Sequence, residues 1–159
     1  MIEVKKSLLL CFLLFLLTGC AQRYELSNLA VVSGVAYDKT EDGIEITMEI
    51  AGEDGEKQQY IRAQGASMEQ AYSQAYLNFD KQIFLPHIKV HIISEELAKE
   101  GVESLLRMIQ KENDFRMDSI LLVAQEARAG DFLASHDFGS GSNSYYISQL
   151  AIKSEAPAM

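Results

Sequence analysis

Cys20 is the residue whose chemistry follows most directly from its neighbours. It ends the segment Leu17-Thr18-Gly19-Cys20, which closes an apolar run that begins at Leu8 and follows two lysines. A cationic start, a short apolar stretch and small residues at the exit are typical of a secretory signal that is removed. The segment has the pattern of a lipobox, in which the cysteine sulfur receives a diacylglyceryl group and becomes the new N-terminus.

A lipid on Cys20 fits this segment better than a membrane-spanning helix does. The apolar run from Leu8 to Leu17 is shorter than the roughly 20 residues that a span needs. Each buried CH₂ contributes about 0.8 kcal/mol, and two acyl chains hold firmly where one holds only marginally. We therefore expect a diacylglycerol anchor on Cys20 and no other cofactor. The alternative is an ordinary cleaved signal followed by a coincidental cysteine.

Two patterns suggest metal ligands, and both have simpler explanations. The segment from Asp38 to Glu49 nearly matches an EF-hand calcium loop, but its flanks alternate like strands, so a hairpin explains the same acids. His87 and His91 are four residues apart, which in a strand corresponds to about 13 Å, too far for one metal. We predict that both histidines lie on a polar face, one of them a candidate for a hydrogen-bonded structural role.

The sequence offers little for catalysis. Ser135, His136 and Asp137 are the residue types of a catalytic triad, but adjacent side chains point apart and cannot form the relay. The chain has no Gly-x-Ser-x-Gly elbow and no glycine-rich phosphate loop. Tyr72 and Tyr76 have helical spacing and are assigned to a core or a helix edge. We therefore expect a non-enzymatic protein.

The residues that follow the anchor are candidates for a partner contact. Arg23, Glu25 and Leu26 lie close to Cys20 and hence to any membrane-embedded partner. One interpretation is an assembly interface made by these three residues. The other is a plain linker in which Leu26 packs on the edge of a sheet.

Charge and cysteine content limit the function classes. The 159-residue chain has a formal net charge of −9, and removing the leader with its two lysines and one glutamate makes the rest slightly more acidic. Such a chain is not expected to bind nucleic acid, and its charge should hold the globule slightly away from anionic headgroups. Cys11 lies in the leader, so the mature chain has no thiol for a disulfide.

The first part of the mature chain has the pattern of three strands. Residues 29–37 are nearly continuously apolar, which favours a central strand, and turn residues follow at 40–43. Residues 44–50 alternate, which predicts a half-buried strand with Glu45, Thr47 and Glu49 on its wet face. Residues 59–66 form a weaker third strand.

Helices and strands alternate in the rest of the chain. Ser67 and Gln70 predict a capping box for a helix that extends to residue 79. A strand is expected after Pro86, and Ser94 caps a second helix that Gly101 interrupts. The remaining elements are a buried strand at 119–124, a short helix at 127–135 and a last helix at 145–154.

This order predicts an α+β fold, a mixed sheet of about five strands with helices packed on it in the order βββαβαβα. The strand-helix-strand units at 59–93 and 86–124 would be right-handed crossovers if their strands pair in parallel. We divide the chain into a signal peptide (1–19), an anchor-proximal linker (20–28), the α+β domain (29–138) and a flexible linker with a C-terminal helix and tail (139–159).

Several blocks of the chain resemble the C-subunit family of spore germinant receptors, the Ger(x)C lipoproteins. The most telling block runs from Phe84 to Gly101, with the sequence FLPHIKVHIISEELAKEG. The lipobox, the segment from Arg23 to Ala30, the strand end from Gly34 to Lys39 and residues 116–124 also match.

The resemblance implies a non-enzymatic receptor subunit, tethered through Cys20 to the outer face of the spore inner membrane. Its partners would be the two integral-membrane subunits of the A and B type, and its role would be assembly or signal relay in spore germination. Two departures are that Ala21 and Gln22 replace a usual tryptophan and acid, and that the chain stops at Met159, so it resembles the N-terminal domain alone. The alternative function is a lipid-anchored binder of small solutes or ions in the cell envelope.

Overall fold

A computed structural model describes residues 28–52, 57–111, 118–135 and 142–155. In chain order, the elements of the described residues are β1 (Leu29–Thr40), β2 (Gly43–Ile50), β3 (Gln59–Gly65), α2 (Met68–Leu77), β4 (Gln82–Phe84), β5 (Val90–Ser94), α3 (Glu95–Glu100), α4 (Glu103–Lys111), β6 (Ile120–Ala124), α5 (Ala129–Ala134) and α6 (Asn143–Glu155).

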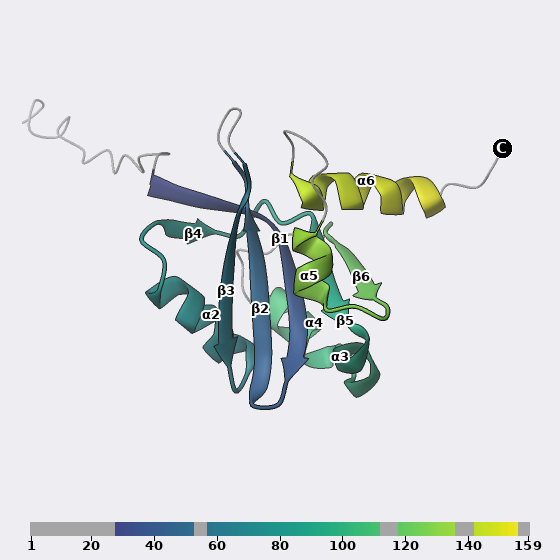
Figure 1. The fold of residues 1–159 in the computed structure, drawn as a ribbon, viewed down its shortest axis with the longest axis horizontal. Helices are drawn as coiled ribbons and strands as arrows, with labels where there is room; N and C mark the ends of the chain where they lie inside the picture. Colours follow the sequence, from purple (N-terminus) through teal and green to yellow (C-terminus); the bar gives the residue numbers. More distant parts are fainter. Residues whose placement is uncertain (1–27, 53–56, 112–117, 136–141, 156–159) are drawn as a thin grey trace, which may run out of the picture.

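The sheet is built around β1, which pairs with strands on both sides (Figure 1). The strand order is β3-β2-β1-β5-β6, and the short β4 pairs in parallel with the first residues of β1. β2 is antiparallel to both β1 and β3, whereas β1, β5 and β6 are parallel neighbours. The predicted α+β fold with a mixed sheet is confirmed. Sequence analysis missed β4 because three residues are too few to show a period.

The predicted turn between the first two strands is confirmed. Thr40 pairs with Gly43, which leaves Glu41 and Asp42 in the turn. Gly43 has a φ of +143°, and a Cβ on it would lie 2.3 Å from the carbonyl oxygen of Gly65 in β3. Only glycine fits this conformation and this approach without strain.

The larger core lies on the sheet face that α2, α3 and α4 cover. Alternate side chains of β1 and β2 point into this core, as the period of 2 in a strand requires. Each helix contributes the residues of one side, as the period of 3.6 in a helix requires. Its most deeply buried members include Val35, Tyr37, Ile46, Met48, Ala71, Ala75, Ile93 and Leu105.

The opposite sheet face is covered by α5 and α6 and holds a smaller apolar cluster. The predicted wet face of β2 lies here, and its exposure was wrongly predicted: Glu45, Thr47 and Glu49 are 8%, 0% and 0% exposed. Alternation correctly separates these three residues from the apolar face of β2. It does not indicate that two helices from the end of the chain return to cover them.

The predicted helix signals are confirmed. Ser67 accepts a hydrogen bond from the backbone N–H of Gln70, and the Gln70 side chain accepts one in return from the N–H of Ala66. This reciprocal pair resembles a capping box, except that the Gln70 side chain bonds to the N–H of Ala66, one residue before the N-cap, rather than to that of the N-cap itself. Ser94 caps α3 in the same way, and Gly101, with a φ of +106°, separates α3 from α4.

Two strands differ from their predictions. β5 begins at Val90 rather than just after Pro86, and His91 is 1% exposed, so its assignment to a polar face was wrong. β6 was predicted to be buried, but it is the last described strand at one edge of the sheet. Leu121 and Val123 are therefore 38% and 47% exposed, because a strand at an edge has a neighbour on one side only.

The two expected crossover units have different outcomes. β3 and β5 do not pair, because β2 and β1 lie between them in the sheet. β5 and β6 pair in parallel over five residues, and α3 and α4 form the connection between them. The second unit is therefore a βαβ crossover, as such a parallel pair requires.

Candidate functional site

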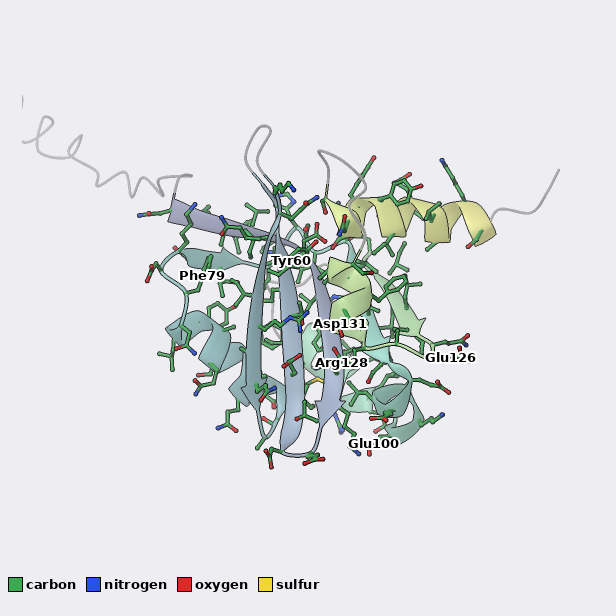
Figure 2. The ribbon with its side chains drawn as sticks, in the orientation of Figure 1. Tyr60, Phe79, Glu100, Glu126, Arg128 and Asp131 are labelled. Carbon is green, nitrogen blue, oxygen red and sulfur yellow. The ribbon has the colours of Figure 1, made fainter. Side chains whose placement is uncertain are left out.

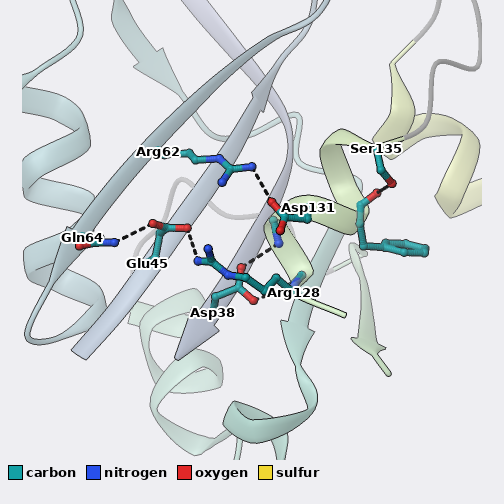
Figure 3. Close-up of polar contacts among 10 residues, drawn as sticks. Asp38, Glu45, Arg62, Gln64, Arg128, Asp131 and Ser135 are labelled. Atoms are coloured by element: carbon teal, nitrogen blue, oxygen red, sulfur yellow. Dashed lines mark hydrogen bonds and ion pairs between the residues drawn. The ribbon is translucent and has the colours of Figure 1, made fainter. Parts of the chain in front are cut away.

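The most extensive polar cluster in the described residues lies between β1–β3 and α5 (Figure 3). The Asp38 carboxylate accepts hydrogen bonds from the backbone N–H groups of Ala129 and Gly130, at 2.7 and 2.8 Å. These are the first two residues of α5, so a carboxylate from β1 caps the positive end of that helix. Gly130 is required because a Cβ there would lie 2.4 Å from the Thr47 hydroxyl.

Two ion pairs extend this cluster across the sheet. Glu45 of β2 pairs with Arg128 and accepts a 2.7 Å hydrogen bond from Gln64 of β3. Arg62 of β3 pairs with Asp131 of α5 at 2.9 Å, and both of these side chains are largely exposed. Figure 3 shows that the charged groups meet one another rather than converging on an open space. The cluster therefore holds α5 on the sheet.

A second buried carboxylate holds α6. Glu49, at the end of β2, accepts hydrogen bonds from the backbone N–H and the hydroxyl of Ser144, at 2.8 and 2.5 Å. A Cβ on Gly34 would lie 1.9 Å from the same hydroxyl, so glycine in β1 lets the helix approach. Ile147 joins the apolar cluster below. α6, which we expected from residue 145 as part of a separate tail, thus packs on the sheet.

These contacts account for the acids of the apparent calcium loop. Asp38 and Glu49 each cap a different helix, and they lie on strands of a hairpin rather than between two helices. In the described ranges, no three His, Asp or Glu side chains are grouped so that they could hold a metal ion.

A polar groove of about 450 Å³ lies at the carboxyl ends of the parallel strands β1, β5 and β6. Ligands of open α/β sheets often bind at such ends. Its cations are already paired: Lys39 with Glu100, and Arg128 with Glu45. Hydrogen bonding and charge from Lys99 lower the pKa of Glu95 at its rim. The residues that line the groove include no nucleophile paired with a base.

A hydrogen-bonded chain of three rings crosses the larger core. The Tyr37 hydroxyl lies 2.8 Å from that of Tyr72 and 3.0 Å from Nδ1 of His91. Burial raises the pKa of both tyrosines and lowers the pKa of His91 to about 4. All three rings are therefore neutral at pH 7. His91 is the hydrogen-bonded structural histidine, whereas His87 is exposed and contacts the ring of Phe84.

The residues predicted to act at the membrane lie outside the described residues: Cys20, Arg23, Glu25 and Leu26. Of the apparent triad, Ser135 donates a hydrogen bond to the carbonyl of Phe132, while His136 and Asp137 are also outside the described ranges. Within those ranges, none of the helices has both the length and the apolarity to cross a bilayer.

Sequence reasoning missed the exposed apolar side of α6. Tyr145, Tyr146, Leu150 and Ile152 are 57%, 43%, 49% and 54% exposed. The signal was available, because apolar residues occur all round this helix and a helix in contact with water on one side is usually polar there.

Comparison with known protein families decides the family. The model of the spore germination protein N-terminal domain matches residues 22–157, which include all of the described residues. The chain belongs to this family. The match confirms the resemblance to the C subunits of germinant receptors, and it includes both α6 and the residues that follow Cys20 from position 22.

Three curated proteins of Bacillus subtilis (strain 168) are similar to this germination domain. YfkR is 29% identical over 136 residues, covering 76% of this chain and 35% of YfkR. Spore germination protein YndF is 24% identical over 191 residues, covering 93% of this chain and 47% of YndF. Spore germination protein KC is 25% identical over 144 residues, covering 79% of this chain and 35% of that protein.

The chain thus spans between about a third and a half of the length of these relatives. Their names support a role for this germination domain in spore germination. No solved structure matches the chain significantly.

Proposed function

We propose that this chain is a lipid-anchored, non-catalytic domain of a nutrient germinant receptor that acts in receptor assembly or signal relay. The family match over residues 22–157 carries the proposal. The buried acids support it, because Asp38 and Glu49 bond to helix amides and so stabilise the fold rather than serve chemistry. Its partners would be the integral-membrane subunits of the A and B type.

The proposed anchor determines where the domain works. Cys20 is separated from β1 by residues 21–28. Eight residues span at most about 28 Å when fully extended, so the start of β1 would stay within that distance of the lipid. The domain would lie against the outer face of the spore inner membrane, where Arg23, Glu25 and Leu26 would meet the membrane subunits.

The anchor is tested by replacing each cysteine in turn. We expect Cys20→Ser to release the protein from the inner membrane of spores or to leave it unprocessed. Cys11→Ser is the matched control, because Cys11 lies in the leader, and this variant should remain membrane-bound. Mass spectrometry of the N-terminal peptide measures the lipid directly. A Cys20→Ser protein that stays in the membrane at the mature size would contradict the anchor.

Receptor assembly is tested by co-purification from spore membranes. The membrane subunits should co-purify with the wild-type chain, and reversing the charges with Arg23→Glu and Glu25→Arg should reduce their recovery. Reversing the exposed pair Glu103 and Arg107 on α4 is the matched control and should have no effect. Equal recovery with both double variants would remove the interface from residues 23–26.

A further inference from the structure

The distribution of residues on α6 is the reverse of what a surface helix usually shows. Its side toward the sheet is largely polar, with Asn143, Ser144 and Ser148 buried and Ile147 the main apolar contact. Its outward side carries the exposed residues Tyr145, Tyr146, Leu150 and Ile152. Surface helices normally turn their apolar side inward, and an exposed apolar patch usually marks an interaction site.

This outward side lies at the end of the molecule where the tether enters. In Figure 1 the start of β1 and α6 both lie along the upper edge, at the left and the right, and the β1–β2 turn lies at the lower edge. The contacts agree, because Ser144 touches Gly34, five residues after the first residue of β1. A tether of eight residues from Cys20 would keep this end near the lipid surface.

The local charge of α6 differs from that of the whole domain. The chain carries 23 acids, yet α6 has a single acid, Glu155 at its last position, against Lys153. Figure 2 places Glu100 at the far end of the molecule and Glu126 and Asp131 well below α6. The net charge repels anionic headgroups as a whole, so the domain would approach them through the outward side of α6, whose described exposed residues are Tyr145, Tyr146, Leu150, Ile152, Lys153 and Ser154.

We infer that the outer side of α6 lies on the bilayer that holds the Cys20 lipid, with its tyrosine, leucine and isoleucine side chains in the interfacial region. The inference rests on the proposed anchor. Tyrosine is enriched at membrane interfaces, and a helix lying in the interface adds affinity to a lipid chain that is already inserted. The contact fixes the orientation of the domain, with the polar groove at the ends of β1, β5 and β6 directed away from the bilayer.

The experiment uses the absence of tryptophan from the chain. A chain that starts at residue 20 has Cys20 as its single cysteine, and it is coupled to a maleimide lipid in vesicles of phosphatidylcholine with some phosphatidylglycerol. Tyr146→Trp reports on α6. Tyr76→Trp on α2 is the matched control, because the two tyrosines are 43% and 45% exposed and α2 covers the other sheet face.

We expect brominated phosphatidylcholine to quench most of the emission of the Tyr146→Trp chain and to shift its maximum to shorter wavelength. The Tyr76→Trp chain should show neither effect. Adding Leu150→Glu and Ile152→Glu to Tyr146→Trp should lower the quenching to the level of the Tyr76→Trp chain, whereas adding Leu77→Glu should leave it unchanged. Thermal unfolding midpoints confirm that each variant is folded.

Equal quenching of the two tryptophans, or no quenching of the tryptophan at position 146, would overturn the inference. The second result is the one expected if α6 contacts another protein domain instead of the bilayer. The coupling is chemical, so this result does not depend on whether cells modify Cys20. An unmodified Cys20 in spores would instead overturn the proposed anchor on which the inference rests, whatever the vesicles show. The two failures are therefore distinguishable.

Discussion

His91 is a buried histidine whose protonation should destabilise the fold. Its pKa is lowered from 6.5 to about 4, so the unfolded chain binds a proton between these pH values and the folded chain does not. The stability contribution is fully present above pH 6.5 and is lost as the pH falls toward 4. The shift corresponds to about 3 kcal/mol of unfolding free energy.

Urea unfolding at pH 7 and pH 4 measures this loss. Carboxylates also titrate in this range, so the comparison is with His91→Gln, which has no titrating group and can still accept a hydrogen bond from Tyr37. We expect the wild-type chain to lose about 3 kcal/mol more than His91→Gln between the two pH values. Parallel losses in the two proteins would show that His91 is accessible or charged in the fold.

Asp38 is an acid whose removal should destabilise the start of α5. It satisfies two amides at the start of α5, and Asp38→Ala would leave both N–H groups buried without their acceptor. We expect a loss of about 2–3 kcal/mol of unfolding free energy. Asp42→Ala, in the exposed turn of the same hairpin, should change it by less than about 0.5 kcal/mol. Chemical denaturation that gave equal losses would contradict the capping role.

At the scale of elements, the attachment of α6 depends on a close approach to β1. A Cβ at position 34 would lie 1.9 Å from the hydroxyl oxygen and 2.7 Å from the Cβ of Ser144. Gly34→Ala should therefore lift α6 and destabilise the domain by about 1–3 kcal/mol. Hydrogen exchange should quicken in α6 more than in β2 and β3.

The control for this prediction removes the opposing atoms. Gly34→Ala combined with Ser144→Gly eliminates both short contacts, although it also loses the hydroxyl bond to Glu49. The double variant should recover part of the exchange protection of α6. If it were as unprotected as Gly34→Ala alone, the close approach would not be what holds the helix.

At the scale of the whole molecule, an apolar edge strand competes with net charge. β6 exposes Leu121 and Val123, and such edges favour association, while a net charge of −9 opposes it. Raising the salt concentration to about 1 M shortens the Debye length to about 3 Å and should promote self-association of the lipid-free chain. Light scattering at increasing protein concentration measures it.

Val123→Lys should prevent this association, because it places a charge on the open edge. Leu77→Lys is the control, since Leu77 is an exposed apolar residue on α2, away from the edge. Association that both variants reduce equally would indicate general apolar contact rather than pairing through β6.

Local chemistry made part of the fold predictable. Ser67 and Gln70 cap α2, Ser94 caps α3, and Gly101 separates α3 from α4 through contacts within a few residues of sequence. Such contacts depend on side-chain type and spacing, which are visible in the sequence. The alternating strand β2 was assigned correctly for the same reason.

The buried charges were not predictable from local patterns. Glu45 and Glu49 looked like solvent-exposed residues, because their partners Arg128 and Ser144 are 83 and 95 positions later. A separation of 54 residues likewise hid the pairing of His91 with Tyr37. The edge position of β6 was also hidden, because a continuous apolar run is equally consistent with a central strand.

For this protein, the sequence alone determined the family, the α+β class and the helix caps, and it predicts an anchor at Cys20, because each depends on residue types in short contiguous patterns. Only the tertiary structure decided that helices cover both faces of the sheet, why Asp38 and Glu49 are buried, and that α6 presents its apolar side outward. These features arise when segments distant in sequence meet across the sheet, and periodicity within one segment carries no information about such meetings.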